Sequence, residues 1–197
     1  MTSSQTEKLI RKTAKQLFAA EGYEGVSMRT LAAASGVGIS SIYHFFADKD
    51  VLLRAIFDDT NTYLGQERKL LKTRATAAQM LHDRIVFQFQ HMEDVVFVLK
   101  YYLHFRSYFM ALPTKTLPPK SVLHIEEVLH KGIATGEFGL PIGEFETKAK
   151  IIAHCINGFL LEYYPQRPGK REQAQLADGL TEFIMRSLKY DGDIAAR

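Results

Sequence analysis

The chain has 197 residues, of which 46% are hydrophobic and 24% are charged, and this composition is typical of a folded globular protein. It excludes collagen-like and disordered chains, and the single cysteine, Cys155, cannot form an internal disulfide. The chain has 25 lysine and arginine residues and 22 aspartate and glutamate residues, which gives a net charge of +3. This charge is too small to indicate a nucleic-acid partner by itself.

Helical periodicity runs through nearly the whole chain, and no alternating run of apolar and polar residues is long enough to predict a sheet. The sequence therefore predicts an all-α protein. The first helix is expected to begin at Ser4–Glu7, which has the spacing of a capping box, and to stop at Gly22. Its apolar face carries Ile10, Ala14 and Phe18.

Two short helices and a long one are expected next. Ser27 is a good N-cap for a short helix that ends in the turn Ser35–Gly38. A third helix covers about Ile39–Phe46, and Asp48 caps a fourth that reaches Tyr63–Leu64. On the third helix Ile39, Ile42 and Phe46 can lie inward, which leaves Ser40, Ser41, Tyr43 and His44 on the opposite face.

The rest of the chain predicts further amphipathic helices. Apolar residues recur at helical spacing over Met80–Phe89 and Val95–Leu112, and again after Pro118-Pro119 up to a glycine-containing loop at Gly132–Gly143. The penultimate helix is apolar or small around most of its circumference, so it must be covered on more than one side. The last helix covers about Glu172–Lys189 and can pair with it.

Two short helices joined by a tight turn, with a longer helix before them, have the arrangement of a helix-turn-helix DNA reader. The hydroxyl, phenol and imidazole groups on the third helix can hydrogen-bond to phosphates or base edges. The pattern alone leaves open that these residues form only the solvated face of a helical hairpin.

The segments Thr30-Leu31-Ala32, Ser35-Gly36-Val37, Ile42–Phe46 and Lys49–Leu53 resemble the DNA-binding signature of the TetR family of transcriptional regulators. The resemblance is specific over Leu9–Ile56 and only architectural beyond it. It implies a homodimer with a helix-turn-helix domain at residues 1–50 and a larger helical domain, residues 51–197, that binds a ligand and dimerises.

The resemblance also assigns site residues by position. It implies that Tyr43 and His44 touch the DNA backbone or base edges, that Ser41 and Lys49 contact phosphates, that Ser27 caps its helix near the backbone, and that Arg29 reaches a base. Ser40 and Ile39 complete the expected set, and Ile39 would meet apolar features such as thymine methyl groups if it faces the groove instead of the core. Lys8, Arg11, Lys12 and Lys15 can neutralise flanking phosphates, although a merely solvated helix face is the alternative for each.

Aromatic residues are concentrated between Arg84 and Leu112, which hold eight of the 22 in the chain. An aromatic face with a few hydroxyl and imidazole groups suits an apolar or aromatic ligand, although packing in the core is the alternative for each residue alone. The expected ligand-binding residues are Phe87, Gln88, His91, Phe97, Tyr101, His104, Phe105 and Tyr108.

The dimer is expected to form through the last two helices of each subunit, so that two recognition helices about 34 Å apart read a palindromic operator. The expected interface residues lie on the apolar stripes of these helices and are Ile152, Ile156, Phe159, Leu160, Tyr163, Leu176, Leu180, Phe183 and Ile184.

The sequence therefore predicts a ligand-responsive homodimeric regulator, a repressor released from its operator when a small effector tilts the long fourth helix. An all-α carrier or scaffold without specific DNA binding is the alternative. No catalytic motif or metal-ligand spacing supports an enzyme, and no cofactor is expected. The apolar run Val95–Leu99 is far short of the roughly 20 residues of a membrane helix, and the N-terminus lacks a secretion signal, so a cytoplasmic protein is expected.

Overall fold

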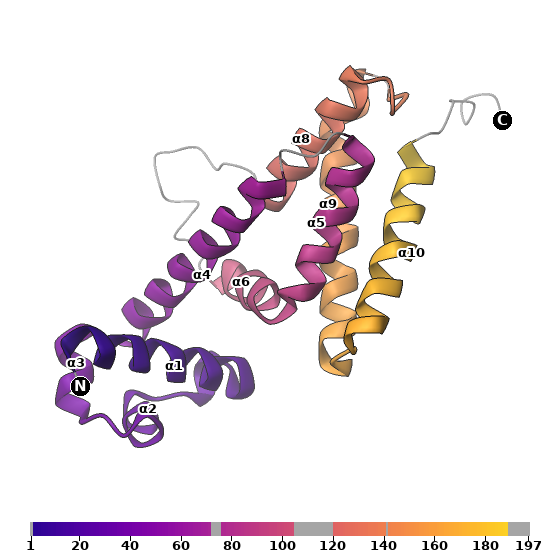
Figure 1. The fold of residues 1–197 in the computed structure, drawn as a ribbon. Coiled ribbons are helices and arrows are strands. Elements are labelled where there is room, and N and C mark those ends of the chain that lie inside the picture. Colours follow the sequence, from indigo (N-terminus) through magenta and orange to yellow (C-terminus); the bar gives the residue numbers. More distant parts are fainter. Residues whose placement is uncertain (1, 72–75, 105–119, 141, 189–197) are drawn as a thin grey trace. The chain divides into compact units, whose positions relative to one another are not determined.

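A computed structural model describes all residues except 1, 72–75, 105–119, 141 and 189–197 (Figure 1). The described residues contain helices and no strands, which confirms the expected all-α class. None of their helices is long and apolar enough to cross a membrane. The chain divides into two compact units, residues 1–64 and 65–197. The expected domain boundary after residue 50 stays a prediction.

The first unit contains α1, α2, α3 and the first part of α4. Their bounds are α1 Ser3–Gly25, α2 Met28–Ser35, α3 Ile39–Phe45 and α4 Lys49–Leu71. The helix α1 packs against both α2 and α3, which also contact each other. Its inward face carries Ile10, Ala14 and Phe18, as the periodicity predicts. Burying a side chain such as Ile10 or Phe18 contributes about 1.5–3 kcal/mol, so this small core holds the short helices in place.

The start of α1 differs from the expectation. Thr2, not Ser4, is the N-cap, and its side chain accepts from the Gln5 N–H while the Gln5 side chain accepts from the Thr2 N–H. Glutamine serves the third position of a capping box as well as glutamate does, so the same box fits two residues earlier. Gly22 has φ +74°, a conformation that favours glycine, and it breaks the helical geometry where the stop was expected.

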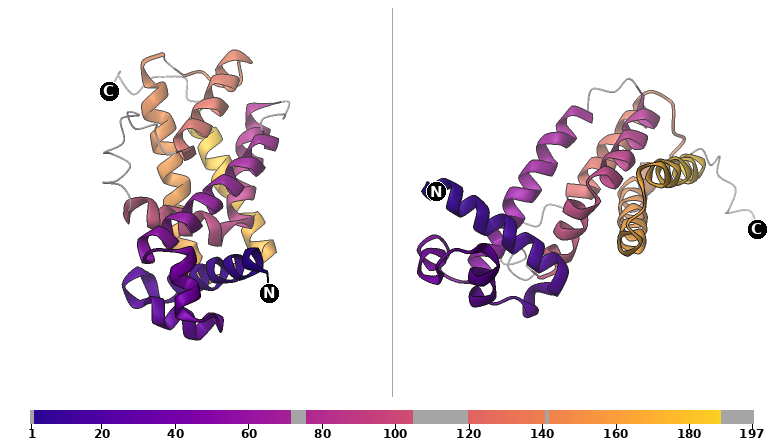
Figure 2. Two further views of the ribbon diagram at one scale, coloured as in Figure 1. Left: turned by 90° about the vertical axis from the view of Figure 1, so that its left-hand side faces the viewer. Right: turned by 60° about the horizontal axis from the view of Figure 1, so that its bottom comes forward.

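The second unit is a helical bundle around α5. The bounds are α5 Ala77–Gln90, α6 Met92–His104, α8 Lys120–Ala134, η1 Ile142–Glu144, α9 Phe145–Tyr163, η2 Tyr164–Gln166 and α10 Lys170–Leu188. The helix α5 contacts α8 and α9 and makes its most extensive contact with α10 (Figures 1 and 2). Ile85 and Phe89 of α5 and Ile125 and Leu129 of α8 are almost fully buried in this core.

Two expected helix boundaries are wrong. The helix expected to begin at Val95 begins at Met92, after a break at His91, and the part of that expectation beyond His104 lies outside the described residues. The helix α4 continues to Leu71 instead of ending near Leu64. The polar residues Gln66–Lys69 hid this continuation, because they interrupt the apolar period on which the expected end was based.

Candidate nucleic-acid interface

Local capping fixes both ends of α2. The Ser27 hydroxyl accepts from the Thr30 N–H at 3.0 Å, and the Thr30 hydroxyl accepts from the Ser27 N–H at 2.9 Å. Gly36 ends α2 with φ +66°, where a side chain would be strained. Val37 is buried at the turn and fixes α3 against α2. Gly36 and the buried Val37 thus form the tight turn that leads from α2 into α3.

The helix α3 has one buried face and one exposed face. Ile42 is fully buried, and Phe46, just after the helix, is 2% exposed. Ile39 is 41% exposed, so of the two placements that the sequence leaves open, the core and the exposed face, the structure has the exposed one. It is the first residue of the helix, and its side chain belongs to the exposed face.

Small and aromatic polar groups make up the rest of the exposed face. Ser40, Ser41, Tyr43 and His44 are all exposed, and Tyr43 is 51% exposed although it is a large aromatic residue. These side chains supply hydroxyl, phenol and imidazole groups that can donate to phosphates or reach base edges. The structure thus brings together the residues expected on α3, while their contact with DNA stays a prediction.

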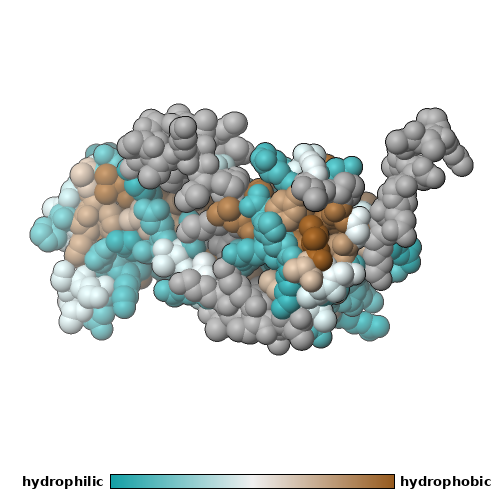
Figure 3. All heavy atoms as spheres, turned by 90° about the horizontal axis from the view of Figure 1, so that it is seen from above, coloured by the Kyte–Doolittle hydropathy of each residue, from teal (hydrophilic) through white to brown (hydrophobic). Residues whose placement is uncertain are grey.

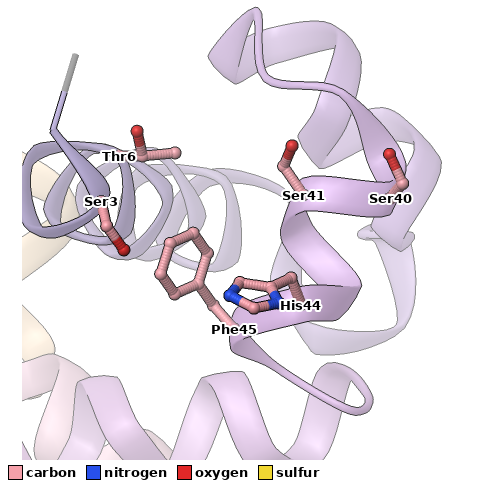
Figure 4. A pocket seen from close by; sticks show the side chains of 6 residues that line it. All are labelled: Ser3, Thr6, Ser40, Ser41, His44 and Phe45. Atoms are coloured by element: carbon pink, nitrogen blue, oxygen red, sulfur yellow. The ribbon is translucent and has the colours of Figure 1, made fainter.

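An open hollow of about 360 Å³ lies between the beginning of α1 and the exposed side of α3 (Figure 4). Ser3 and Thr6 of α1 line it opposite Ser41, His44 and Phe45. Figure 4 shows the rings of His44 and Phe45 next to each other at the α1 side of α3, with their centroids 5.2 Å apart. The lining therefore holds several hydroxyl groups and one imidazole beside the candidate reading face.

Two of the residues expected to contact DNA lie on α2 or just before it. Ser27 and Arg29 are both exposed. The cap at Ser27 uses its hydroxyl, so the side chain has a structural role whatever else it contacts. The guanidinium of Arg29 can form a bidentate pair with a guanine edge, which is the chemistry expected of it.

Lys49 is held by the protein itself. Its Nζ donates to the Tyr23 carbonyl oxygen at 2.8 Å and lies 3.9 Å from the centroid of the Tyr23 ring. The Tyr23 hydroxyl in turn donates to the Asp50 carboxylate. Burial, followed by this bond and by nearby acidic groups, raises the pKa of Tyr23 above its usual value. These three residues tie the end of α1 to the beginning of α4.

The four basic residues of α1 do not share one role. Arg11 Nη2 lies 2.6 Å from Glu7 Oε1, and Arg11 Nη1 lies 2.8 Å from Asp59 Oδ2 on α4. Lys15, also on α1, donates to the hydroxyl of Thr60 on α4 at 3.1 Å. Lys8 and Lys12 are exposed, and no ion pair of theirs is found among the described residues. Those two are the better candidates for flanking phosphates.

The aromatic residues expected to bind a ligand divide by burial. Phe87, Phe97 and Tyr101 are buried, and the ring centroids of Phe97 and Tyr101 are 4.7 Å apart. Burial raises the pKa of the Tyr101 phenol. His104 is exposed. Phe105 and Tyr108 lie outside the described residues.

Polar groups accompany this aromatic cluster. Gln88 is 4% exposed, and Arg84, one helical turn before it on α5, is 2% exposed. Arg84 was not among the residues expected from the sequence, although it lies at helical spacing on the same face as Leu81 and Ile85, which was a readable signal. His91 is half-buried, and it lines a hollow of about 340 Å³ together with Glu93 and Arg167.

The residues expected at the dimer interface also differ in burial. Five of them are buried inside the subunit, none more than 5% exposed, and these are Ile152, Ile156, Leu160, Leu180 and Ile184. These side chains already pack in the core of their own subunit, and their contact with a partner stays a prediction. Phe159, Tyr163 and Leu176 are partly exposed and Phe183 is 66% exposed.

Other apolar side chains remain exposed on these last helices. Ile151 is 59% exposed and Leu161 is 42% exposed, both on α9. Figure 3 shows hydrophobic side chains reaching the molecular surface among hydrophilic ones. Among the described residues, no three histidine, cysteine or acidic side chains gather as metal ligands would.

Comparisons with known proteins place residues 10–56 in a family model described as bacterial regulatory proteins, tetR family. A helix-turn-helix-type transcriptional regulator of Staphylococcus aureus is 33% identical over 67 residues. That match covers 34% of this chain and 36% of the relative, so it spans about a third of the relative's length.

Solved structures of low sequence identity share the fold over nearly the full chain. FadR of Bacillus subtilis, solved in complex with stearoyl-CoA, is 17% identical with a TM-score of 0.67 and covers 90% of this chain and 97% of its own. KstR2 of Mycobacterium tuberculosis, a ketosteroid transcriptional regulator, is 17% identical with a TM-score of 0.72 and covers 97% and 98%. A TetR-family regulator of Agrobacterium tumefaciens is 16% identical with a TM-score of 0.73 and covers 96% and 100%.

Proposed function

The chain belongs, through its N-terminal domain, to the TetR family of transcriptional regulators, and from this premise we propose that it is a homodimeric repressor released from a palindromic operator by a small apolar effector. The observation that carries the proposal is the exposed face of α3, where Tyr43 and His44 stand out from a helix anchored by the buried Ile42. The matching family consists of regulatory proteins, not enzymes. Such a regulator works on DNA in the cytoplasm.

The proposed reading of DNA places α3 in the major groove. Tyr43, His44 and Ser41 contact phosphates or base edges, while Arg29 pairs with a base from α2. Ile39 is exposed and meets apolar features such as thymine methyl groups. Lys8 and Lys12 add affinity that depends on salt and carries no sequence information.

The proposed dimer uses the exposed apolar residues of the last two helices. Ile151 and Leu161 on α9 and Phe183 on α10 are large apolar side chains that the subunit leaves in water. Covering them with the same surface of a second copy removes that apolar area from water, which favours association. Two subunits related by a two-fold axis then present two copies of α3 to two operator half-sites.

The proposed effector has a large apolar body. The buried rings of Phe87, Phe97 and Tyr101 supply a surface that suits such a molecule. Two proteins of the same fold support this class, since FadR was solved with stearoyl-CoA and KstR2 is described as a ketosteroid regulator. The helix α4 begins in the first unit and ends in the second, so a ligand that favours a tilted α4 can act on the reading helix.

A gel shift on duplex DNA from upstream of the chain's own gene tests the proposal, at low and at physiological salt and against competitor DNA. We expect a discrete complex that survives the higher salt. Tyr43→Ala should weaken it about 5- to 150-fold, since a lost base or phosphate contact costs about 1–3 kcal/mol. Tyr43 is half exposed, so the variant should keep the melting temperature of the parent.

Two results would speak against DNA recognition by α3. One is a smear that disappears at physiological salt, because it would show only nonspecific phosphate attraction. The other is a specific complex that Tyr43→Ala leaves unchanged. Gln90→Ala on α5 serves as a control, because its exposed side chain lies outside the first unit and away from the proposed dimer face.

A further inference from the structure

An open hollow of about 340 Å³ lies in the second unit where the end of α5, the beginning of α6, η2 and the beginning of α10 come together. Glu93 and Asp94 of α6 line it together with Tyr164 of η2 and Arg167 of the following turn. Among the described residues expected to bind a ligand, His91 alone lines this hollow. Its volume is sufficient for a small metabolite, so it is a candidate site apart from the buried aromatic cluster.

Arg167 has a backbone conformation that glycine adopts more easily. Its φ is +47°, and among the described residues it is the one residue other than glycine with a positive φ. Such a conformation is unfavourable for a residue with a Cβ atom. The Arg167 side chain is exposed, and no hydrogen bond or ion pair of its guanidinium is found in the described part of the chain. Interactions within the subunit therefore do not explain why arginine occupies this position.

The turn that carries Arg167 is fixed by contacts with two neighbouring helices. Pro168 is buried, and its carbonyl oxygen accepts from Nε2 of Gln173 on α10 at 2.9 Å. The Arg167 N–H donates to the Tyr164 carbonyl oxygen at 3.3 Å. Nζ of Lys100 on α6 lies 5.4 Å from the centroid of the Tyr164 ring. A fixed turn presents the guanidinium at the hollow, so a ligand that binds it orders little additional backbone.

Carboxylates line the same hollow from the first turn of α6. Asp94 is half-buried and already has a partner within the chain. Glu93 is exposed, and no ion pair between Glu93 and Arg167 is found in the regions that the structure describes. Two side chains of opposite charge thus line one hollow without neutralising each other directly. This arrangement suits a molecule that carries both an anionic and a cationic group.

We propose that this hollow binds a free α-amino acid with an apolar side chain. Arg167 holds the α-carboxylate in the bidentate manner that suits a planar guanidinium, and Glu93 accepts from the α-ammonium group. The apolar side chain packs against the half-buried ring of Tyr164. The inference goes beyond the proposed function, because it adds a ligand site that DNA binding does not require.

Three ligands that differ in their charged groups provide the test. L-phenylalanine carries both groups, 3-phenylpropanoate lacks the ammonium group, and 2-phenylethylamine lacks the carboxylate. Isothermal titration calorimetry with the full chain measures the affinity for each. We expect saturable binding of L-phenylalanine, at least tenfold tighter than that of either analogue, because each analogue loses one charged hydrogen-bonding contact.

Two variants should each remove one half of this preference. Arg167→Gly should weaken L-phenylalanine and 3-phenylpropanoate at least tenfold and leave 2-phenylethylamine within twofold. Its melting temperature should be at least that of the parent, because glycine suits the positive φ. Glu93→Gln should weaken L-phenylalanine and 2-phenylethylamine and leave 3-phenylpropanoate within twofold. Arg186→Met, a control on α10 that removes an arginine side chain 79% exposed outside the hollow, should change none of the three.

Three results would overturn the inference. The first is a parent without saturable binding of L-phenylalanine, and the second is a parent that binds all three ligands equally. The third is an equal loss of all three ligands in Arg167→Gly, since this pattern would show a purely structural arginine. Calorimetry needs no DNA, so it decides the inference whether or not the chain binds an operator, while the gel shift tests the proposed function independently.

Discussion

The ammonium group of Lys49 is occupied by Tyr23, which it contacts both through the backbone oxygen and through the ring face. A hydrogen bond from a charged donor and a cation–π contact together contribute about 1–2 kcal/mol to stability. Because Lys49 is the first residue of α4, these contacts position that helix against the end of α1. They favour a positioning role over direct contact with phosphate.

We therefore predict that Lys49→Met lowers the free energy of unfolding by about 1–2 kcal/mol and leaves the salt dependence of operator binding unchanged. Urea denaturation measures the first quantity, and gel shifts at several salt concentrations measure the second. Losing a real phosphate contact would instead reduce the slope of log K against log salt by about 1. Lys8→Met is the matched variant, since Lys8 is exposed, and we expect it to reduce the slope without changing stability.

Single residues show what the sequence could and could not reveal about the candidate interface. Ser27, Gly36 and Ile42 occupy the roles that their types predict, because capping and burial depend on neighbours a few residues away. Ile39 has the same apolar character as Ile42 but lies at the helix start, and only the packing of α1 and α2 decides that one is covered and the other exposed.

Glu137 joins two helices that are far apart in the sequence. Its carboxylate oxygens accept from the N–H groups of Ala77 at 3.0 Å and Ala78 at 3.1 Å, at the beginning of α5. Thr76 accepts from the next free donor, Gln79, so the first turn of α5 is capped by two segments. The sequence predicted only a glycine-containing loop here, because a cap supplied from 60 residues away leaves no local pattern.

The turn after α8 requires glycine at position 132, because the ring of Phe138 lies close to its backbone. A Cβ atom on Gly132 would lie 2.0 Å from a ring carbon of Phe138, so a larger residue forces that buried ring to move. Gly136 has φ +73°, which turns the chain after α8. Glycine spacing thus indicated a turn correctly, while the ring that fills the space beside Gly132 depends on tertiary packing.

The charge of Glu137 should make stability depend on pH. Burial alone would raise the pKa of this carboxyl, but hydrogen bonds from Ala77, Thr135 and Ala78, with the charge of Lys131, outweigh that and lower the pKa. A lowered pKa in the folded state means that the ionised form stabilises the fold above the unfolded pKa of about 4.3 and that this contribution is lost as the pH falls through the folded pKa.

We predict that Glu137→Ala lowers the free energy of unfolding by about 1 kcal/mol at pH 7, the usual cost of a lost cap. The difference between parent and variant should shrink as the pH falls through the lowered folded pKa, where the parent loses its charge. Urea denaturation at pH 7 and pH 3.5 measures both values. A difference that stays constant with pH would mean that the charge of Glu137 does not stabilise α5. Glu126→Ala, on α8, is a control outside this cap.

At the level of the whole molecule, helical periodicity was sufficient to predict the fold class but not to predict which apolar side chains are exposed. The all-α class follows from spacing that is repeated over most of the chain. The penultimate helix is apolar on most sides, so its sequence could not tell which side meets the subunit core. The structure buries Ile152, Ile156 and Leu160 and leaves Ile151 and Leu161 exposed, so the exposed apolar residues lie on the opposite face of α9 from the buried ones.

Phe183 and Ile184 are neighbours on α10, but Phe183 is 66% exposed and Ile184 is 1% exposed. Substitutions at these two positions can therefore distinguish effects on dimer association from effects on folding. Phe183→Asp should convert a dimer into a folded monomer, because it places a charge in the apolar surface that the proposed partner covers. Ile184→Ala should instead cost about 2–4 kcal/mol of stability by leaving a cavity in the core. Sedimentation equilibrium measures the first effect and urea denaturation at fixed protein concentration the second.

The same variant connects association with DNA binding. A monomer offers one recognition helix, so Phe183→Asp should weaken binding to a palindromic operator by at least tenfold while binding to a single half-site remains. The first unit is unchanged in this variant, since residue 183 lies in the second. If Phe183→Asp sediments as the parent dimer does at micromolar concentration, the exposed face of α10 does not form the subunit interface, and the covering surface must be sought elsewhere.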